Sequence, residues 1–394
     1  MKEPSDVAEP HWLDPAAQSA RSRAWAATMH GHQLEPAIRV RSAHETSSAR
    51  IDLERPLLRE ERESMLDAFL ASGATRAVGS GQRAVEEAPD PVRTSFERDR
   101  DRILHGNAFR RLAGKTQVFV FPGDHQRTRL THALEVAQVA RSIARACRLN
   151  VALAEAIALG HDCGHGPGGH ASEDALSPYI DGGYDHATWG ADVVLAPLNL
   201  CAETLDGIRN HSWSRPAPST PEGEVVSWAD RIAYVCHDFE DAVAAGIVRA
   251  DGLPPVVLER CGADRSSQLN AFIRGMVEAV AATGRIAMVE DLAEALAHFR
   301  RWNYERIYLR PASQEQAAAV IAVLQKLVEH YADRPHLLRD LRPHAADAAA
   351  GSTDAFRAAV TYVGGMTDRF ACAAAVTELG WDPAKLPRGI GVVR

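Results

Sequence analysis

The sequence has few cysteines, no long apolar run and almost no extended alternating pattern. None of its six cysteines stands in a Cys-x-x-Cys pair, and they lie at positions 147, 163, 201, 236, 261 and 372. Such spacing favours reduced thiols over a disulfide framework or a zinc ribbon. No stretch reaches the length that spans a bilayer, and no apolar segment follows Met1. We therefore expect a cytoplasmic protein that has no membrane partner.

The chain also has fewer basic than acidic residues. The 394 residues carry a net charge of −8 and a pI near 6.1. This balance excludes a protein coated with positive charge for wrapping nucleic acid or covering an anionic membrane, although a local basic site stays compatible with it. With 46% hydrophobic and 24% charged residues the chain can bury a large core, so we expect one large folded domain or two fused ones.

The patterns divide the chain into three zones. Residues 1–92 are polar and interrupted by prolines, with one helix expected from about Pro56 to Leu70. We interpret this zone as an N-terminal arm and a candidate subunit contact. Residues 93–250 form the expected catalytic core, and residues 251–394 form a C-terminal helical region packed on that core.

Helical periodicity dominates the expected core. Apolar residues recur at steps of three and four through residues 130–147, which indicates a helix with one buried face. Asn150 is a suitable N-cap for the next helix, expected from Val151 to Leu159. The main extended run is Gln117–Phe121. The predicted fold is therefore mostly α, with at most a short hairpin.

The most informative motif is His161-Asp162, which follows an apolar helical run and precedes a glycine-rich turn. Adjacent residues offer an imidazole nitrogen and a carboxylate oxygen there, a pair that suits a divalent metal. His132 upstream and Asp230 downstream each lie within an amphipathic stretch. A lone histidine is more often a surface or core residue, but a buried His-Asp pair is costly without a compensating charge. Together these residues predict a metal site.

Asp230, Tyr234 and Asp238 are spaced at i, i+4 and i+8, which places them on one helix face. A substrate bound at the metal would meet the phenol and the second carboxylate as well. The alternative is that Tyr234 and Asp238 are an ordinary pair on a helix surface.

Three longer blocks narrow the interpretation. Arg98–His105, Ala108–Phe119 and Arg127–His132 are followed in order by Gly183–His186, Asp230–Asp238 and Tyr362–Arg369. The order His, His-Asp, Asp resembles the HD metal-dependent phosphohydrolases, and the blocks over roughly residues 94–375 resemble the deoxynucleoside triphosphate triphosphohydrolases, which include the bacterial dGTPases. That family cuts between the 5′ oxygen and the α-phosphorus, which requires a metal and cations that hold the triphosphate.

The resemblance implies an HD-domain helical phosphohydrolase fold and a role for each matched residue. One divalent ion, Mn²⁺ or Mg²⁺ with Fe²⁺ or Co²⁺ as alternatives, would bind His132, His161, Asp162 and Asp230. His170 and Glu173 would form the acid/base pair, with the carboxylate reaching back to the imidazole, and His165 and His186 would face the phosphates. Deoxyribose would meet Gln117, Val118, Tyr234 and Asp238, while Arg129 and Arg231 would hold phosphate. The family also implies a homo-oligomer.

The sequence departs from the family pattern at several positions. Cys163 replaces an aliphatic residue, Pro167-Gly168-Gly169 replaces a Pro-Phe-Gly turn, and Asn210 replaces a lysine. The base preference is therefore open, and a shorter phosphate chain or a different phosphate ester is an alternative substrate. Cys163 lacks a partner set that would make it a nucleophile. The glycines of this turn are not a P-loop, because no Gly-Lys-Ser/Thr follows them.

Two other classes of function remain alternatives. The first is another HD enzyme, a nucleotide monophosphatase or a phosphodiesterase, which would lack the block from Arg98 to Gln117. The second is a non-catalytic nucleotide sensor or a module that binds single-stranded nucleic acid, with the basic residues between Arg93 and Arg129 as a phosphate footprint. Identification of the phosphate product separates the first class, and salt-dependent DNA binding without turnover would indicate the second.

Overall fold

Contacts within the chain divide it into two units, Met1–Pro56 and Leu57–Arg394. The structure, a computed structural model, describes residues 19–34, 39–338 and 347–389. The predicted N-terminal arm therefore lies partly outside the described residues, at 1–18 and 35–38. Residues 57–92 belong to the larger unit, and the expected domain boundary near residue 92 stays a prediction.

The smaller unit contains one short helix and two short strands in its described part. Helix α1 spans Ala20–Ala27 and begins with the Ser19 hydroxyl accepting a hydrogen bond from the Ser22 amide at 3.1 Å. Strands β1 (His32–Gln33) and β2 (Arg41–Ser42) pair antiparallel, with His32 opposite Ser42.

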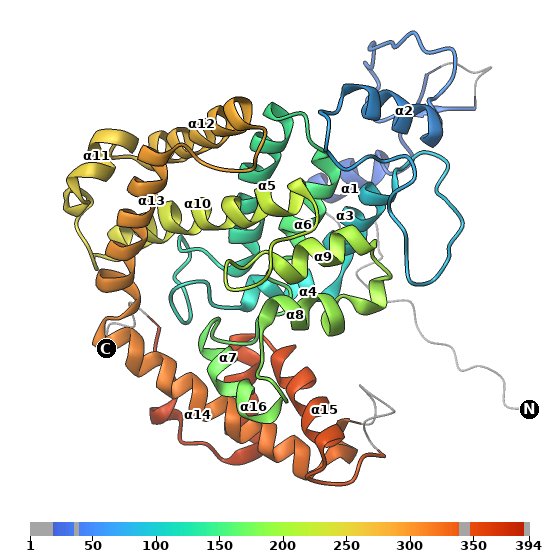
Figure 1. Cartoon of the computed structure of the whole chain (residues 1–394). Helices are drawn as coiled ribbons and strands as arrows, with labels where there is room; N and C mark the ends of the chain where they lie inside the picture. The colour runs from blue at the N-terminus through green and yellow to red at the C-terminus, as the bar shows by residue number, and fades with distance from the viewer. Residues whose placement is uncertain (1–18, 35–38, 339–346, 390–394) are drawn as a thin grey trace, which may run out of the picture. The chain divides into compact units, whose positions relative to one another are not determined.

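The regular secondary structure of the larger unit consists of helices joined by loops in the residues that the structure describes (Figure 1). Its first helices are α2 (Arg59–Phe69), α3 (Ser95–His105), α4 (Asn107–Arg111), α5 (Arg129–Ala146), α6 (Val151–Gly160), α7 (Ala171–Leu176), α8 (His186–Trp189) and α9 (Ala202–Asn210). The later helices are α10 (Pro221–Ala244), α11 (Pro255–Cys261), α12 (Arg265–Thr283), α13 (Glu290–Asn303), α14 (Pro311–Asp333), α15 (Thr353–Gly364) and α16 (Asp368–Leu379). The prediction of a mostly α fold is confirmed, and α2 lies within the helix expected from about Pro56 to Leu70.

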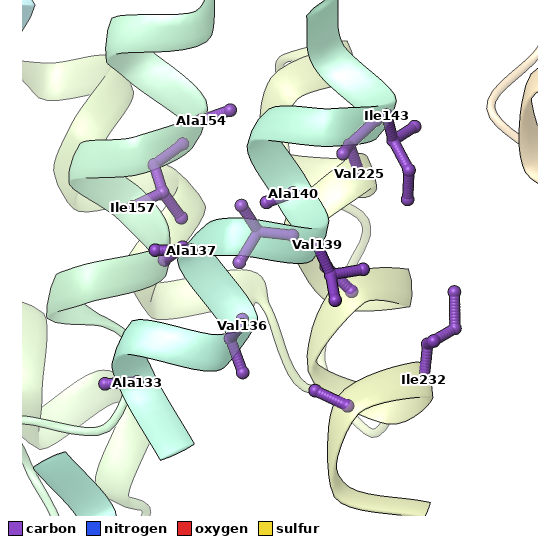
Figure 2. Packing of buried hydrophobic residues seen from close by; sticks show 14 of the residues in the cluster. Ala133, Val136, Ala137, Val139, Ala140, Ile143, Ala154, Ile157, Val225 and Ile232 are labelled. Atoms are coloured by element: carbon purple, nitrogen blue, oxygen red, sulfur yellow. The ribbon is translucent and has the colours of Figure 1, made fainter. Parts of the chain in front are cut away.

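Helices α5, α6 and α10 form the centre of the main hydrophobic core. Small side chains of α5, such as Ala133, Ala137 and Ala140, face α6 and α10, and Figure 2 shows them among Ile157 and Ile232. These side chains are at most 4% exposed. Alanine and valine at steps of three and four let the helix backbones approach closely. The three helices that carry the predicted metal ligands are therefore held rigidly against one another.

Helix starts follow the capping chemistry expected from the sequence. The Asn150 side chain accepts a hydrogen bond from the Leu153 amide at 3.2 Å, which confirms the predicted N-cap of α6. At α3 the Thr94 hydroxyl accepts from the Glu97 amide, and the Glu97 carboxylate accepts from the Thr94 amide at 2.8 Å. Each reciprocal bond satisfies a donor that the helix start leaves free.

A second hydrophobic cluster joins α7 to α14, α15 and α16, coloured orange and red in Figure 1. Leu176 of α7, Leu327 of α14 and Val360 of α15 are fully buried in it. The helix that follows the glycine-rich turn thus packs directly on the C-terminal helices.

Residues 57–94 are fastened to the core by buried polar contacts. Glu222 at the start of α10 is fully buried, and its carboxylate accepts from the Thr75 amide at 3.1 Å, the Thr75 hydroxyl at 2.6 Å and the Asn150 amide at 2.8 Å. Arg83 pairs with the fully buried Asp99 at 2.6 Å. A buried carboxylate without such donors is costly, so these contacts hold the segment in place.

The extended run Gln117–Phe121 forms no strand in the structure. One isolated bridge joins Thr116 to Thr128, and Phe121 turns the chain with a φ of 50°. Phe119 packs against Ala242 and Ile307 instead of against a neighbouring strand. Among the described residues no strand pairs with this segment, so its alternating pattern forms no sheet.

None of the described helices is long and apolar enough to cross a membrane.

Candidate active site and metal centre

A cavity of about 510 Å³ opens beside the glycine-rich turn. Its walls come from the Thr116–Val120 segment and from α5, α7, α8, α10, α13 and α14. All predicted site residues except His161 line this cavity. They are Gln117, Val118, Arg129, His132, Asp162, His165, His170, Glu173, His186, Asp230, Arg231, Tyr234 and Asp238. Segments as far apart in sequence as Thr116 and Ala317 therefore meet at one cavity.

The four predicted metal ligands lie together at one end of this cavity. The Nε2 atom of His132 is 3.0 Å from Oδ1 of Asp230, and that of His161 is 3.7 Å from the same oxygen. Asp162 lies 3.4 Å from His161 through Oδ1 and 3.8 Å from His132 through Oδ2. Two imidazole nitrogens and two carboxylates at such separations can surround one divalent ion.

The tautomers of these histidines suit a cation. Nδ1 of His161 is 2.6 Å from the carbonyl of Ala158 and, as its N–H donor, leaves the Nε2 lone pair facing the carboxylates. That Nε2 has no hydrogen-bond partner among the described residues, although His161 is fully buried. A metal ion would occupy the lone pair that nothing else satisfies.

The electrostatics of the cluster also favour positive charge. Burial opposes protonation of His161, yet the carboxylates of Asp162 and Asp230 raise its pKa to about 9. Burial likewise opposes ionisation of Asp162 and Asp230, but neighbouring cations and hydrogen bonds hold both pKa values well below the usual range. The cluster thus keeps two buried carboxylates charged, and a divalent ion would balance them.

Arg129 extends this charge network into the cavity. Its Nη1 forms an ion pair with Oδ2 of Asp162 at 2.6 Å, and its side chain is only 2% exposed. Its Nε and Nη2 atoms have no hydrogen-bond partner among the described residues. A buried guanidinium with free N–H groups at a cavity wall can accept an anionic ligand.

Glu173 contacts a different histidine from the one expected. Its Oε1 hydrogen-bonds to Nδ1 of His186, whereas His170 lies exposed at the cavity. Hydrogen bonding to His186 lowers the pKa of Glu173 although burial opposes this. Helix α7 begins at Ala171, so His170 is the residue just before its first turn. A ring nitrogen of His170 lies within 4.8 Å of the Glu173 carboxylate without a hydrogen bond between them, so the predicted acid/base pair stays a prediction.

A row of histidines connects this pair to the metal ligands. The ring of His186 stacks on that of His165 with centroids 3.7 Å apart, and its Nε2 is 3.3 Å from Nε2 of His211. His165 lies 3.3 Å from Asp162, and His211 packs edge-on against His161. These contacts provide a path of titratable groups from Glu173 to the metal ligands.

The opposite end of the cavity is aromatic and carries one buried carboxyl. Asp238 is 3% exposed, accepts a hydrogen bond from the Tyr308 hydroxyl through Oδ2, and leaves Oδ1 without a partner among the described residues. Burial raises its pKa to about 8. Tyr234 accepts a hydrogen bond from Nε of Arg300 at 2.7 Å. Across the cavity, Oε1 of Gln117 is also buried without a partner.

The C-terminal helices hold the two backbone segments that frame the cavity. Asp368 accepts from the Gly168 amide at 2.8 Å and from the Thr116 hydroxyl at 2.6 Å. The buried Nζ of Lys115 donates to the carbonyls of His165 and Gly364, the latter at 2.9 Å. Burial lowers the pKa of Lys115 to about 8.

Glycine is required at the turn itself. A Cβ on Gly164 would lie 2.0 Å from the carbonyl oxygen of His186, so no other residue fits there. Gly168 has a φ of +75°, and a Cβ on it would lie 2.4 Å from Cγ1 of Val320 on α14. At Gly168 the sequence departs from the family pattern by lacking a side chain, and helix α14 lies close to the turn at this position. Cys163 beside the turn is buried, and burial raises its pKa to about 12, which is unsuited to a nucleophile.

Sequence reasoning assigned no role to several residues that line the cavity, namely His211, Trp213, Arg300 and Tyr308, nor to Lys115 and Asp368, which hold its framing segments. His211 follows the last residue of α9 and carried no metal-ligand spacing. Lys115 and Asp368 stand within quoted blocks, so their positions were visible but their contacts were not. Tyr308 and Arg300 lie in a region where the sequence offered only helical periodicity.

Comparison with known proteins places the chain in a family. Residues 129–235 match the HD domain, and residues 286–376 match the phosphohydrolase-associated domain. A protein from Caldanaerobacter subterraneus is 39% identical over 321 residues, covering 80% of this chain and 93% of the relative. One from Clostridium perfringens is 39% identical over 306 residues, with 74% and 88% covered. Another, from a Jannaschia species, is 37% identical over 360 residues, with 73% and 90% covered.

Each of these relatives is described as a deoxyguanosinetriphosphate triphosphohydrolase-like protein. The similarity covers more than two thirds of this chain, and the matched HD region contains the His/Asp cluster. The chain belongs to the HD-domain phosphohydrolases, within the family of deoxyguanosinetriphosphate triphosphohydrolase-like proteins.

Proposed function

We propose that the protein hydrolyses deoxynucleoside triphosphates to a deoxynucleoside and inorganic triphosphate. The observation that carries this proposal is a single cavity with three kinds of group in sequence along it. A His/Asp cluster lies at one end, a buried arginine with free N–H groups lies beside it, and a buried carboxyl with one free oxygen lies among tyrosines at the far end. A phosphate chain and a sugar hydroxyl would satisfy these groups together.

His132, His161, Asp162 and Asp230 would hold one divalent ion, with Mn²⁺ or Mg²⁺ first and Fe²⁺ or Co²⁺ as alternatives. Such an ion polarises a phosphoryl oxygen and lowers the pKa of a bound water. Arg129 and Arg231 would neutralise charge on the phosphates, because both line the cavity near the cluster.

The reaction requires one proton to leave the attacking water and one to reach the 5′ oxygen when its bond to the α-phosphorus breaks. His170 is proposed to carry a proton at this point, since its imidazole is exposed at the cavity. Glu173 would act through His186, which it contacts, and His165 would face the phosphates with His186. His170→Ala and His186→Ala, compared side by side, would show which imidazole moves the proton.

Asp238 and Tyr308 would hold the 3′ hydroxyl of the sugar. The free Oδ1 of Asp238 can accept a hydrogen bond from that hydroxyl. Tyr234 would stack on the sugar, and Gln117 with Val118 would form the wall that excludes a 2′ hydroxyl. This wall lies in the same cavity as Asp238.

The decisive experiment identifies the phosphate product. Metal-loaded protein is incubated with each dNTP and each NTP, and phosphates are separated by ion chromatography. We expect triphosphate from at least one dNTP and little from the matching NTP. In water labelled with heavy oxygen the label should enter the triphosphate and not the deoxynucleoside. Release of only pyrophosphate or orthophosphate would contradict the proposal and favour another HD phosphohydrolase.

We also propose a homo-oligomer. Met65, Leu66 and Phe69 of α2 are between 46% and 62% exposed, and a cluster of large apolar side chains on one helix is suited to a subunit contact. A monomeric mass by light scattering at micromolar concentration would contradict this. Binding of single-stranded nucleic acid stays a separate prediction, which a salt titration would test.

A further inference from the structure

Arg231 is held in the cavity in a different way from its other arginines. Arg129 is fixed by an ion pair with Asp162 at 2.6 Å, and Arg300 by its hydrogen bond to Tyr234 at 2.7 Å. Arg231 has no carboxylate within ion-pair distance among the residues that the structure describes. Its guanidinium carbon instead lies 3.4 Å from the centroid of the Trp213 ring.

Trp213 is itself fastened to the helix that carries Arg231. Its indole Nε1–H donates to the carbonyl of Ser227 at 3.1 Å, and its ring packs edge-on against Trp228 with centroids 4.7 Å apart. Ser227 lies one turn before Arg231 on α10. The indole therefore contacts α10 at two places one turn apart. Its N–H donates to the Ser227 carbonyl, and its ring lies against the Arg231 guanidinium.

Stacking determines the plane of a guanidinium without using its N–H groups. The donors of arginine lie in the plane of the group and point outward from its edge, where they match two oxygens of a phosphate. An ion pair would occupy part of that edge. A ring face leaves that edge free of an ion pair, with the Tyr234 hydroxyl as its polar neighbour, and both Trp213 and Arg231 line the cavity.

We propose that Trp213 is a positioning residue that orients Arg231 toward the phosphate chain of the substrate. The inference rests on the proposed function, because it assigns the anion to the same cavity. It names a residue that the sequence patterns did not single out. Trp213 is 46% exposed, so its place on the cavity wall is not explained by a need to fill the core.

The test compares variants that separate the effect of the Trp213 ring from that of the Arg231 charge. Trp213→Leu removes the stacking face, Trp213→Phe retains an aromatic face, and Arg231→Lys retains the charge but loses the planar group. Inorganic tripolyphosphate binding to the metal-loaded protein is measured by calorimetry, and KM and kcat are measured with the best dNTP. We expect Trp213→Leu to weaken tripolyphosphate binding and raise KM by about tenfold, from the range of a cation–π contact. Trp213→Phe should recover most of this loss.

A double-variant cycle distinguishes positioning from a general structural role. Adding Trp213→Leu to Arg231→Lys should cause little further loss, because the ring acts through the guanidinium. The matched control is Phe121→Leu, which removes another aromatic ring under an arginine, Arg369, outside the cavity. It should leave tripolyphosphate affinity and KM unchanged.

Several outcomes would overturn the proposal. Equal losses from Trp213→Leu in both arginine backgrounds would show that the ring does not act through Arg231. Unchanged tripolyphosphate affinity in Trp213→Leu, or no binding by the wild-type protein, would also refute it. Failure of the proposed function would give a different result. A protein that binds tripolyphosphate but cleaves no dNTP would refute the proposed activity. The calorimetric measurements on the single and double variants would still test the role of Trp213.

Discussion

Replacing Asp238 by asparagine should change how stability depends on pH. Burial raises the pKa of Asp238 from 3.8 to about 8. Between these values the unfolded chain has released this proton while the folded chain retains it. Stability therefore falls as pH rises through this window, by at most about 1.4 kcal/mol per pH unit. An asparagine cannot ionise, so its presence removes this loss.

The magnitude follows from the window and the contacts. From pH 5 to pH 8 the upper bound is about 4 kcal/mol, three units at about 1.4 each. The Tyr308 hydroxyl donates to the carboxyl and the cavity admits water, which both reduce the cost of the charged form. We expect about half of the bound, near 2 kcal/mol. Asparagine has a carbonyl oxygen that can accept the same bond, so packing should change little.

The assay is urea unfolding of wild-type and Asp238→Asn protein at both pH values, in the presence of a chelator so that bound cations do not contribute. The variant's stability advantage over the wild type should grow by about 2 kcal/mol between pH 5 and pH 8. Asp174→Asn is the control, because Asp174 is an exposed carboxylate that lines the same cavity. An equal effect at both pH values, or an advantage that shrinks between pH 5 and pH 8, would refute the reasoning.

Three further predictions concern the metal centre, the proton transfer and the C-terminal contacts. Asp230→Ala should abolish binding of the divalent ion, and full occupancy by elemental analysis would refute the ligand assignment. His170→Ala should lose about 10²- to 10⁴-fold in turnover while still binding metal and deoxynucleotide, and near-normal release of triphosphate would contradict its role. Asp368→Ala leaves the buried donors of Gly168 and Thr116 unpaired, so unfolding free energy should fall by about 2–4 kcal/mol. Asp368→Asn should lose less, and equal losses in urea titrations would contradict this account.

The helical fold could be predicted because its signals are local. Asn150 caps α6 through a bond to a residue three positions away, and the apolar spacing on α5 follows from helix geometry alone. The ligand candidates His132, His161 and Asp230 were found in the same way, since each stands at a recognisable place on its own helix. Their meeting at one cavity depends on packing among three helices.

The parts that were not predicted depend on contacts between distant segments. Glu173 is close in sequence to His170 yet contacts His186, because the turn before α7 and the start of α8 fold together. The cluster around Asp238 includes Tyr308, which lies 70 residues away. The extended pattern at Gln117–Phe121 was misleading for the same reason, since a strand requires a partner that the sequence around it cannot supply.

The burial of Glu222 limits how the chain can be shortened. Its carboxylate relies on donors from Thr75 as well as from Asn150, whereas the matched HD region begins only at residue 129. A fragment that starts at Ser95 would remove two of its three donors and leave a fully buried charge poorly compensated. The smallest fragment that retains this network must begin before Thr75, so exchange of catalytic regions between relatives has to carry the preceding segment with it.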